Sequence, residues 1–331
     1  MRIKVLHVGL GPIGAAIAAQ ASRRERLVIA GAVDLDPSMT GCDLGKVIRS
    51  RRRFDVTVSA DLAGTLKAVR PDVAVVSTSS SLREALPVFE TILKAKVPIV
   101  STTEELAFPV KSHAAEAKRI DALAKRARVA VLGTGVNPGF VMDALPIALT
   151  AVCADVTAIE VDRVQDARIR RVPFQQKIGA GLSPDEFAAR AKAGTIGHVG
   201  MAESIAMIAE ALDWKLDRVA GDLKPKIADE QIDGGAVPVD RGAVAGIVQD
   251  AVGYRKGKAL VTLHLEAYLG APESYDAVRI AGTPPVSMRI AGGIHGDIAT
   301  ASIVVNAIPR ILQAPPGLRT MRDMVLPSFE R

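Results

Sequence analysis

The 331-residue sequence is poor in aromatic side chains, which make up 3% of it. Proteins that hold single-stranded nucleic acid usually stack its bases on aromatic rings, so this composition argues against that function. The net charge of +6 does not reverse the argument, because the lysines and arginines are scattered along the chain. Their one dense run is RSRRRF at 49–54, and no organised basic helix is present. We therefore expect no nucleic-acid partner.

Cysteine and long apolar runs are also scarce. Cys42 and Cys153 lie far apart without the spacing of a metal site, so we expect reduced thiols, no bound metal and a cytoplasmic protein. No run approaches the roughly 20 apolar residues that cross a bilayer. The first apolar run is too short for a signal peptide and leads directly into a glycine turn. The sequence therefore predicts no membrane partner.

The first 135 residues alternate short apolar runs with helical patterns. Buried strands that alternate with helices form βαβ units and a parallel sheet. We expect strands at IKVLHVG, LVIAGAVD, DVAVVST, VPIVST and VAVLGTG, and a further short one at FDVTV. Helices are expected at 12–21, 62–69, 82–94 and about 109–128. The predicted fold class is α/β, with a doubly wound Rossmann sheet.

From about residue 136 the pattern changes to alternating strands such as DVTAIEVDRVQDA. Residues 243–270 predict two strands around a hairpin at 255–258, and helices are expected after Ser183, which begins a capping box, and at 201–211. These features predict a second α+β domain with a mixed or antiparallel sheet. We assign 137–299 to this substrate and oligomerisation domain. A dinucleotide-binding domain then comprises 1–136 and about 300–331, rejoined by a last apolar helix near 297–308.

The motif GLGPIG at 9–14 follows the first predicted strand and opens the first predicted helix. Gly9 would make the tight turn, Gly11 would let the backbone approach a pyrophosphate, and Gly14 would let helix and strand pack closely. Asp34 stands twenty residues after Gly14, at the end of the next strand, where it can accept hydrogen bonds from the adenosine ribose. The expected cofactor-binding residues are Gly9, Gly11, Pro12, Ile13, Gly14, Asp34, Ser79, Ser80 and Asn137.

The choice between NAD and NADP stays open at this point. Asp34 favours NAD, because an acidic residue at this place accepts hydrogen bonds from the ribose hydroxyls. The arginines Arg49, Arg51, Arg52 and Arg53 either form a solvated loop or neutralise the 2′-phosphate of NADP.

Polar residues follow the predicted central strands, where ligands bind in a doubly wound sheet. Ser79 and Ser80 could line the nicotinamide ribose, cap the next helix, or do both. Glu104 and Glu105 follow VPIVSTT, and a carboxylate there could hold a substrate ammonium or accept its proton. Neighbouring side chains do not both point at one site, so one of them is expected to cap and solubilise a helix. We choose Glu104 as the catalytic residue.

The segment GVNPGF at 135–140 is a strongly marked turn, because Asn-Pro-Gly restricts the backbone. It lies at the predicted domain junction, where Asn137 is well placed to touch nicotinamide. An ordinary hinge is the other interpretation, and a hinge does not exclude that contact.

Several blocks together resemble the 2,4-diaminopentanoate dehydrogenase and native amine dehydrogenase family, within the wider group that includes dihydrodipicolinate reductase. They are GLGPIG, STTEELAFP, GTGVNPGFVMDALP, QQKIGAGLSPDEF, GTIGHVGMAES and GDIATASIVVNAIPR, and the resemblance covers nearly the whole chain. It implies an NAD(P)-dependent enzyme that interconverts a small primary amine or diamino acid with a carbonyl compound and ammonia. It also implies a catalytic glutamate at Glu104 and a homodimer.

The resemblance further implies a set of substrate-binding residues, two of which share a face of one strand. They are Arg163, Gln165, His264 and Thr300, and Asn137 and Phe140, which follow the predicted strand VAVLGTG, are expected to bind substrate with them. In family members that act on amino acids, positions similar to Arg163 and His264 hold a carboxylate and a second amine. Gln165 stands where asparagine is expected in the diaminopentanoate enzymes, so the substrate is left open.

Each of these residues also has a plain structural interpretation. Arg163 would be a solvated cation on a sheet face, and His264 a satisfied, half-buried histidine. His198 is expected to anchor a turn. Lys177 is expected in the loop at the domain junction, where it could touch cofactor or substrate.

Two other functions are kept as alternatives. One is an imine or enoyl reductase like dihydrodipicolinate reductase, although RRVPFQQ before Lys177 lacks the histidine pair expected there. The other is a regulator that binds NAD(P)H without turnover and has no need of a glutamate in the cleft. Related sugar dehydrogenases carry Glu-Lys-Pro where this chain has TTEE.

Overall fold

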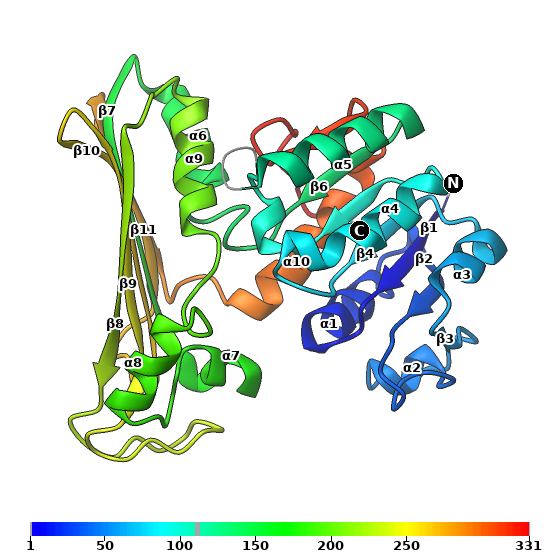
Figure 1. Cartoon of the computed structure of the whole chain (residues 1–331), viewed down its shortest axis with the longest axis horizontal. Coiled ribbons are helices and arrows are strands. Elements are labelled where there is room, and N and C mark those ends of the chain that lie inside the picture. Colours follow the sequence, from blue (N-terminus) through cyan, green and yellow to red (C-terminus); the bar gives the residue numbers. More distant parts are fainter. Residues whose placement is uncertain (1, 110–112, 331) are drawn as a thin grey trace. The chain divides into compact units, whose positions relative to one another are not determined.

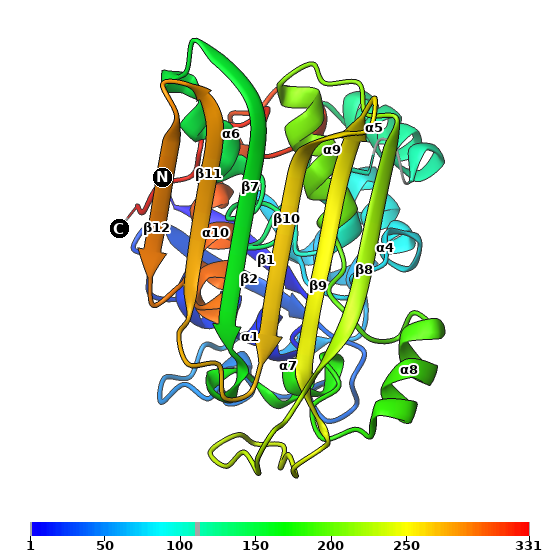
Figure 2. The ribbon, with the colours of Figure 1, turned by 90° about the vertical axis from the view of Figure 1, so that its left-hand side faces the viewer.

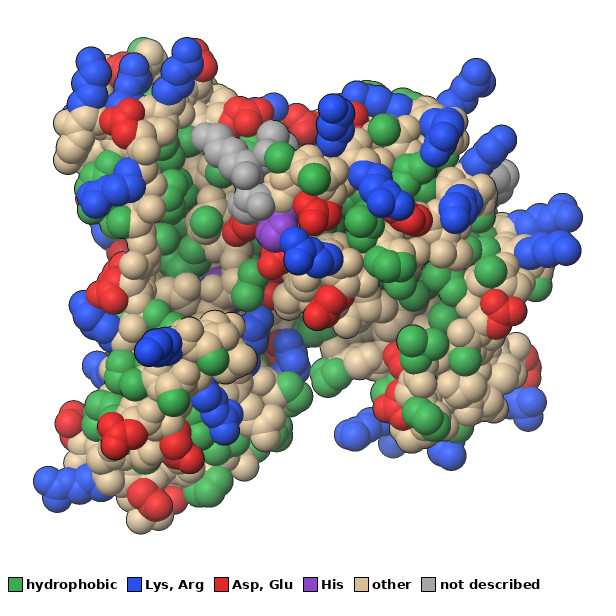
Figure 3. Space-filling view, viewed as in Figure 1, with side chains coloured by type: hydrophobic (Ala, Val, Ile, Leu, Met, Phe, Trp, Pro, Cys, Tyr) green, Lys and Arg blue, Asp and Glu red, His purple; other side chains and the backbone are tan. Residues whose placement is uncertain are grey.

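The computed structural model describes residues 2–109 and 113–330. The chain forms two compact units (Figure 1). The first unit comprises Met1–Phe140 and Asp297–Arg331, and the second comprises Val141–Gly296. Among the described residues no helix is both long and apolar enough to cross a membrane. On the face seen in Figure 3, Lys and Arg side chains are scattered among acidic and apolar ones.

The first unit contains a seven-stranded sheet in the order β3-β2-β1-β4-β5-β6-β13, in which every pairing is parallel. The strands are β1 (Ile3–Val8), β2 (Leu27–Val33), β3 (Val58–Ser59), β4 (Val73–Val76), β5 (Ile99–Ser101), β6 (Ala130–Gly133) and β13 (Gly317–Arg319). The order reverses between β1 and β4, which is the doubly wound arrangement. The predicted Rossmann sheet is therefore confirmed. The edge strand β13 was not predicted, because three residues carry no periodic pattern.

Helices cover this sheet on both faces (Figure 1). They are α1 (Pro12–Ala21), α2 (Leu44–Val47), α3 (Leu62–Val69), α4 (Leu82–Lys94), the 3-10 turn η1 (Glu104–Leu106), α5 (Ala114–Ala127) and α10 (Gly296–Ile311). On one face, α3, α4 and α5 bury an apolar cluster with the sheet. On the other, α1 packs on β1 and β2. Ser302 of α10 donates a hydrogen bond to Gln20 of α1 at 3.0 Å, so α10 lies beside α1.

The helix expected from about residue 109 begins later, at Ala114. Residues 110–112 of that expected range lie outside the described residues. The apolar stripe of α5, with Ala117, Ile120 and Ala124 buried, starts only at this point. The prediction was therefore wrong at Pro109 and His113, which lie outside the helix.

The second unit contains a six-stranded mixed sheet in the order β12-β11-β7-β10-β9-β8. The strands are β7 (Asp155–Asp166), β8 (Arg218–Ile227), β9 (Val244–Arg255), β10 (Lys258–Tyr268), β11 (Tyr275–Thr283) and β12 (Val286–Ala291). β7 and β10 run parallel, and the other neighbours run antiparallel. The predicted hairpin joins β9 to β10. The edge strand β8 was missed, because Pro225 and its exposed polar residues hide the pattern.

Helices cover only one face of this sheet. α9 (Met201–Ala211) packs on β9 and β10, and α6 (Ala144–Leu149) packs on α9. No described helix lies over the other face, which Figure 2 shows from the front. The remaining short elements are η2 (Thr150–Val152), η3 (Ala167–Ile169), α7 (Val172–Lys177) and α8 (Pro184–Lys192).

Two sequence predictions concern α8 and α7, and the structure confirms only the first. The capping box is confirmed, because the Ser183 hydroxyl accepts from the Glu186 amide and the Glu186 carboxylate accepts from the Ser183 amide at 2.9 Å. Lys177, in contrast, was expected in a loop and instead ends helix α7. Proline in the first turn is tolerated because those amides have no helical partner, but it hid this helix in the sequence.

Candidate active site

The turn between β1 and α1 is shaped by glycine. Gly9 has φ of +86°, and a Cβ there would lie 2.6 Å from the Ser77 carbonyl oxygen. A Cβ on Gly14 would overlap the carbonyl oxygen of Gly9. A Cβ on Gly11 would meet nothing within 4 Å, so the backbone there borders open space. With Pro12 beginning α1, amides at the start of a helix face this space, which fits a dinucleotide pyrophosphate.

Asp34 is joined to this turn directly. Its Oδ2 accepts a hydrogen bond from the amide of Leu10 at 2.5 Å, and its Oδ1 accepts from the amide of Asp36 at 2.8 Å. Leu10 lies between Gly9 and Gly11. The structure thus brings together the glycine turn and the acidic residue that the sequence separates by twenty positions.

Of the two serines after β4, Ser79 contacts the start of helix α4. Ser79 Oγ donates to Glu84 Oε2 at 2.6 Å and accepts from the amide of Ser81 at 3.0 Å. Ser80 is exposed, and its carbonyl oxygen accepts from the amide of Glu105 at 3.3 Å. Of the two interpretations, the helix-capping one describes what the Ser79 side chain does here.

The neighbouring glutamates differ in what holds them. Glu105 Oε2 accepts from the amide of Leu82 at 2.7 Å, at the start of α4, and lies 3.4 Å from Nε2 of His113. Glu105 is therefore the carboxylate that caps a helix. Glu104 begins η1 directly after β5, and its side chain is half-buried. A Cβ on Gly133 would lie 2.6 Å from the Leu106 carbonyl carbon, so η1 packs tightly on the end of β6.

The turn after β6 lies beside the first turns of α10. The amide of Val136 donates to Thr300 Oγ1 at 3.3 Å. Asn137 and Phe140 follow in this turn, and both are half-buried. Because β5 and β6 are paired neighbours, the turn and Glu104 follow adjacent strand ends. The structure thus collects Glu104, Asn137, Phe140 and Thr300 at one edge of the sheet.

In the second unit, Arg163 and Gln165 share the helix-covered face of the sheet. Arg163 is 3% exposed, and its Nη1 contacts Oδ1 of Asp276 at 2.6 Å. Arg163 Nη2 and Gln165 Nε2 both donate to the carbonyl oxygen of Ile294, at 2.7 and 3.2 Å. Burial lowers the pKa of Arg163, against the opposing effect of Asp276. The interpretation of Arg163 as a solvated cation was wrong.

His264 lies on the opposite, bare face. Across β10 and β7 it pairs with Asp162, whereas Arg163 pairs with Leu265, and successive strand residues alternate between faces. The structure therefore does not bring His264 together with Arg163. One substrate whose carboxylate and second amine contact Arg163 and His264 of the same chain, as the resemblance implied, does not fit this arrangement.

Each ring nitrogen of His264 instead has a carboxylate partner. Its Nδ1 is 2.7 Å from Asp250 and its Nε2 is 3.1 Å from Glu266. Burial lowers the pKa of His264, but the hydrogen bonds to these two carboxylates outweigh that effect and raise it. This is the half-buried, satisfied histidine of the structural interpretation.

Other contacts were not predicted, although a sequence signal existed for one of them. A buried arginine needs a carboxylate on a neighbouring strand, and Asp276 begins DAVRIAG. The side chain of Gln249 clamps His198 by accepting from its amide at 2.8 Å and donating to its carbonyl oxygen at 3.0 Å. In the ranges that the structure describes, no group of three His, Cys, Asp or Glu side chains could hold a metal ion.

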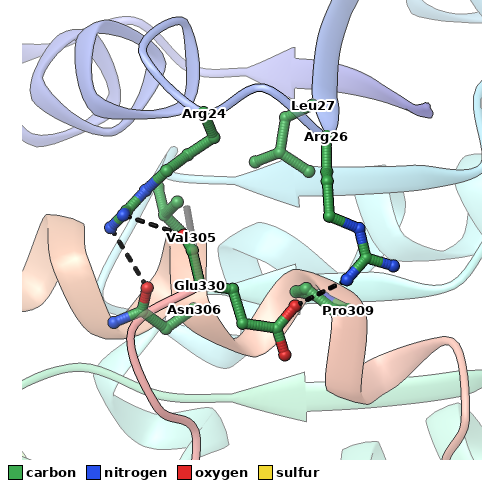
Figure 4. Close-up of a pocket in the computed structure, with 7 residues that line it drawn as sticks. All are labelled: Arg24, Arg26, Leu27, Val305, Asn306, Pro309 and Glu330. Atoms are coloured by element: carbon green, nitrogen blue, oxygen red, sulfur yellow. Dashed lines mark hydrogen bonds and ion pairs between the residues drawn. The ribbon is translucent and has the colours of Figure 1, made fainter.

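A separate small pocket lies at the amino end of β2 (Figure 4). Arg26 contacts the Glu330 carboxylate there at 3.0 Å, and Arg24 donates to the Glu330 carbonyl at 2.9 Å and to Asn306 at 3.2 Å. Ligands of a parallel sheet bind at the carboxyl ends of its strands. This pocket is therefore a docking place for the chain's own C-terminal segment.

Comparison with known proteins bears on the whole chain. Residues 140–329 match the model of the 2,4-diaminopentanoate dehydrogenase C-terminal domain. The chain is 33% identical over 334 residues to 2,4-diaminopentanoate dehydrogenase from Acetoanaerobium sticklandii, covering 98% of this chain and 94% of that protein. The chain belongs to the 2,4-diaminopentanoate dehydrogenase family. The predicted family resemblance is thereby confirmed.

Solved structures agree with this family fold. An amine dehydrogenase from Mycobacterium smegmatis is similar to this 2,4-diaminopentanoate dehydrogenase family member with a TM-score of 0.89, at 19% identity, over 100% of this chain and 98% of that one. A dipicolinate-bound dihydrodipicolinate reductase from Paenisporosarcina sp. TG-14 reaches a TM-score of 0.56 at 13% identity, over 98% and 100%. At these identities the likeness describes the fold.

Proposed function

We propose that the protein is an NAD(P)-dependent amine dehydrogenase that reversibly deaminates a small primary amine or diamino acid to a carbonyl compound and ammonia. Family membership makes it an oxidoreductase acting on amine donors. One observation carries the site assignment. Of two adjacent glutamates beyond β5, Glu105 binds the Leu82 amide at the start of α4, whereas Glu104 begins η1 directly after β5, at the edge of the sheet where ligands bind.

The cofactor proposal rests on the turn between β1 and α1. Gly9, Gly11 and Gly14 leave room for a pyrophosphate, and Asp34 stands at the ribose position. When bound there, NAD or NADP would accept or supply the hydride. Pro12 and Ile13 lie in the first turn of α1, whose amides would face the phosphates.

Glu104 would handle the charge and the proton of the amine. A substrate ammonium has no lone pair to assist loss of hydride, so it must first lose a proton, and a carboxylate at this edge can accept it. In the opposite direction ammonia would add to the carbonyl, water would leave and the imine nitrogen would take a proton, and the carboxylate would stabilise the resulting iminium cation. We propose that Asn137, Phe140 and Thr300 position the reacting carbon beside it.

The second unit is proposed to supply the substrate and oligomerisation functions. We assign Gln165 to substrate binding. Arg163 would hold the backbone at Ile294 in place, because both side chains donate hydrogen bonds to the Ile294 carbonyl oxygen. His264 belongs to the bare sheet face, which we propose packs against a second copy in a homodimer. The charged Arg279 on that face is already paired with Asp162 at 2.6 Å and with Glu160 at 3.0 Å. A second copy could therefore pack there without leaving the Arg279 charge unpaired. Two free thiols, Cys42 and Cys153, support a cytoplasmic location.

The deciding experiment measures NADH and NADPH oxidation with a panel of small aldehydes, ketones and keto acids, with and without ammonium. We expect oxidation that requires ammonium. Glu104→Gln should lose roughly 10²–10⁴-fold in turnover while still binding cofactor, because it removes the proton acceptor. Glu105→Gln is the matched control: it should keep turnover and lower the melting temperature.

Other outcomes point elsewhere. Oxidation without ammonium would favour reduction of a carbonyl compound to an alcohol, or an enoyl-type reduction, with Glu104 as a general acid. Cofactor binding without turnover on any substrate would favour a regulator. If Glu104→Gln kept full activity and Glu105→Gln lost it, the two assignments would be exchanged.

A further inference from the structure

One side of helix α10 makes hydrogen bonds and ion pairs along most of its length. The residues that make them stand at every fourth position and therefore lie in one row on the helix, which we call the α10 seam: Ile298, Ser302, Asn306 and Arg310. The carbonyl oxygen of Ile298 accepts from Gln20 of α1 at 3.2 Å, and the Ser302 hydroxyl donates to Gln20 at 3.0 Å. The first half of the seam is thus fixed to α1.

The second half of the seam is fixed by residues 328–330, which we call the C-terminal segment. The Arg310 guanidinium lies 3.0 Å from the Glu330 carboxylate. Arg24, which follows α1, donates both to the Asn306 side chain at 3.2 Å and to the Glu330 carbonyl oxygen at 2.9 Å (Figure 4). The C-terminal segment therefore contacts the seam directly and also through Arg24.

The Glu330 carboxylate joins α10 to the sheet. Its Oε1 contacts Arg310, and its Oε2 contacts Arg26, which directly precedes β2, at 3.0 Å. The Glu330 side chain is only 26% exposed, so water shields these contacts incompletely. The Phe329 ring adds an apolar contact, since its centre lies 4.1 Å from the Arg24 guanidinium.

The end of α10 has a specific need for this support. Pro309 has no amide hydrogen and cannot donate to the carbonyl oxygen of Val305, so the helix lacks one hydrogen bond in its last turns. Arg310 comes directly after this break. Its contact with Glu330 therefore holds a part of α10 that the helical hydrogen bonds hold less firmly.

The seam lies on a different side of α10 from the candidate site. Thr300 stands two residues after Ile298, which is roughly 200° around an α-helix. Its Oγ1 accepts from the amide of Val136, in the turn after β6, at 3.3 Å. A rotation of α10 about its axis would move Thr300 relative to that turn, and contacts along the seam prevent such a rotation.

We infer that the C-terminal segment is a positioning element for the reaction: by holding Arg310 and Asn306 it fixes the rotation of α10, and so keeps Thr300 against the turn after β6. The inference rests on the proposed function, in which Thr300 and this turn position the reacting carbon. A misplacement of about 1 Å caused far from the reacting atoms can cost on the order of a hundredfold in rate, so Glu330→Gln should lower kcat/KM roughly tenfold. Affinity for NADH should not change, because the glycine turn makes no contact with this segment.

The first readout is hydrogen exchange, which needs neither substrate nor cofactor. Mass spectrometry follows the amides of residues 134–140 in the native chain, in Glu330→Gln, in Arg310→Gln and in a chain that ends at Pro327. We expect faster exchange in all three variants, because the Val136 amide loses a steady acceptor. Glu273→Gln is the matched control, since it breaks another ion pair, with Arg289 at 2.7 Å in the second unit.

The second readout is kcat/KM for the ammonium-dependent reaction, with the dissociation constant of NADH and the melting temperature measured alongside. Glu330→Gln and Arg310→Gln should each lower kcat/KM well below the melting temperature, and the double variant should lose little more than either one, because both act through one contact. The chain that ends at Pro327 should lose most. If that chain fails to fold, the two glutamine variants still decide.

Faster exchange in residues 134–140 together with a lower kcat/KM, neither of them seen in Glu273→Gln, supports the inference. A lower melting temperature with the exchange of this turn or kcat/KM unchanged overturns it, because the segment would then only stabilise the fold. Equal effects in the control also overturn it. A native chain without ammonium-dependent activity would instead overturn the proposed function, and the exchange measurement would still show whether the segment positions the turn.

Discussion

The two sheets of this molecule treat polar side chains in opposite ways. In the first, strands such as β4 and β6 are buried at every position, because helices cover both faces. In the second, β12 alternates between half-buried and exposed residues, and one face has no described helix over it. His7 in β1 has no hydrogen-bond partner among the described residues, whereas His264 in β10 has two carboxylates.

This difference shows where each sheet can hold polar side chains that could take part in a reaction. A strand buried on both faces offers no polar partner along its length, so useful polar groups collect beyond its end, as Asp34 and Glu104 do. A sheet with a bare face can hold charges along its strands, as the contact of Arg279 with Asp162 illustrates. The proposed catalytic groups accordingly follow strand ends in the first unit.

The largest effect should come from breaking the buried ion pair of the second sheet. Asp276→Ala leaves the Arg163 charge buried without its carboxylate, which should lower the free energy of unfolding by about 3–5 kcal/mol. Urea denaturation measures it. On the bare face, Arg279→Ala should cost less than about 1 kcal/mol, because the side chains of Arg279 and its partner Glu160 are 47% and 52% exposed. If both variants lost the same free energy of unfolding, the two faces of the sheet would not differ in how much their ion pairs stabilise the protein.

The next effect is a pH dependence set in the first sheet. Burial lowers the pKa of His7 from 6.5 to about 4. The unfolded chain therefore binds more protons than the folded one between these values, and stability falls as the pH falls through that window. By pH 4 the loss should reach about 3 kcal/mol. Denaturation between pH 7.5 and 4.5 should show this slope in the native chain and lack it in His7→Leu.

His264 should give a smaller effect of opposite sign. Because its pKa is raised in the folded state, its stabilising contribution is complete below pH 6.5 and is lost as the pH rises through the folded value. The group is partly accessible, so we expect less than about 1 kcal/mol. His264→Gln should flatten the stability profile on the alkaline side and leave the acid slope of His7 in place. A flattened acid side instead would contradict these assignments.

Local sequence patterns were enough to predict much of this fold. The predicted ranges of α1, α3, α4 and α9 agree with the structure, because helix periodicity and turn residues lie within each segment. Strand β8 and helix α7 were missed, since Pro225 and Pro173 obscured their patterns. The family resemblance could also be recognised from the sequence, because it rests on contiguous blocks of residues.

The candidate site was harder to predict from the sequence, because it depends on contacts between residues that lie far apart in the chain. Choosing between Glu104 and Glu105 needs the Leu82 amide, 23 residues away from Glu105 in the chain. Arg163 meets Asp276 across 113 residues. Whether His264 lies beside Arg163 depends on strand register, and no local pattern gives that register.

The order in which the first unit is assembled has a consequence during protein synthesis. Its edge strand β13, its helix α10 and the segment that places Glu330 beside Arg26 all follow Val141–Gly296 in the chain. A ribosome working at about 5–20 residues per second needs roughly ten to thirty seconds to make that intervening unit. Throughout this interval β6 has a free edge, and the face of α1 that binds α10 is uncovered. The emerging chain should therefore depend on chaperones most strongly at this stage, and the second unit can fold before the first is complete.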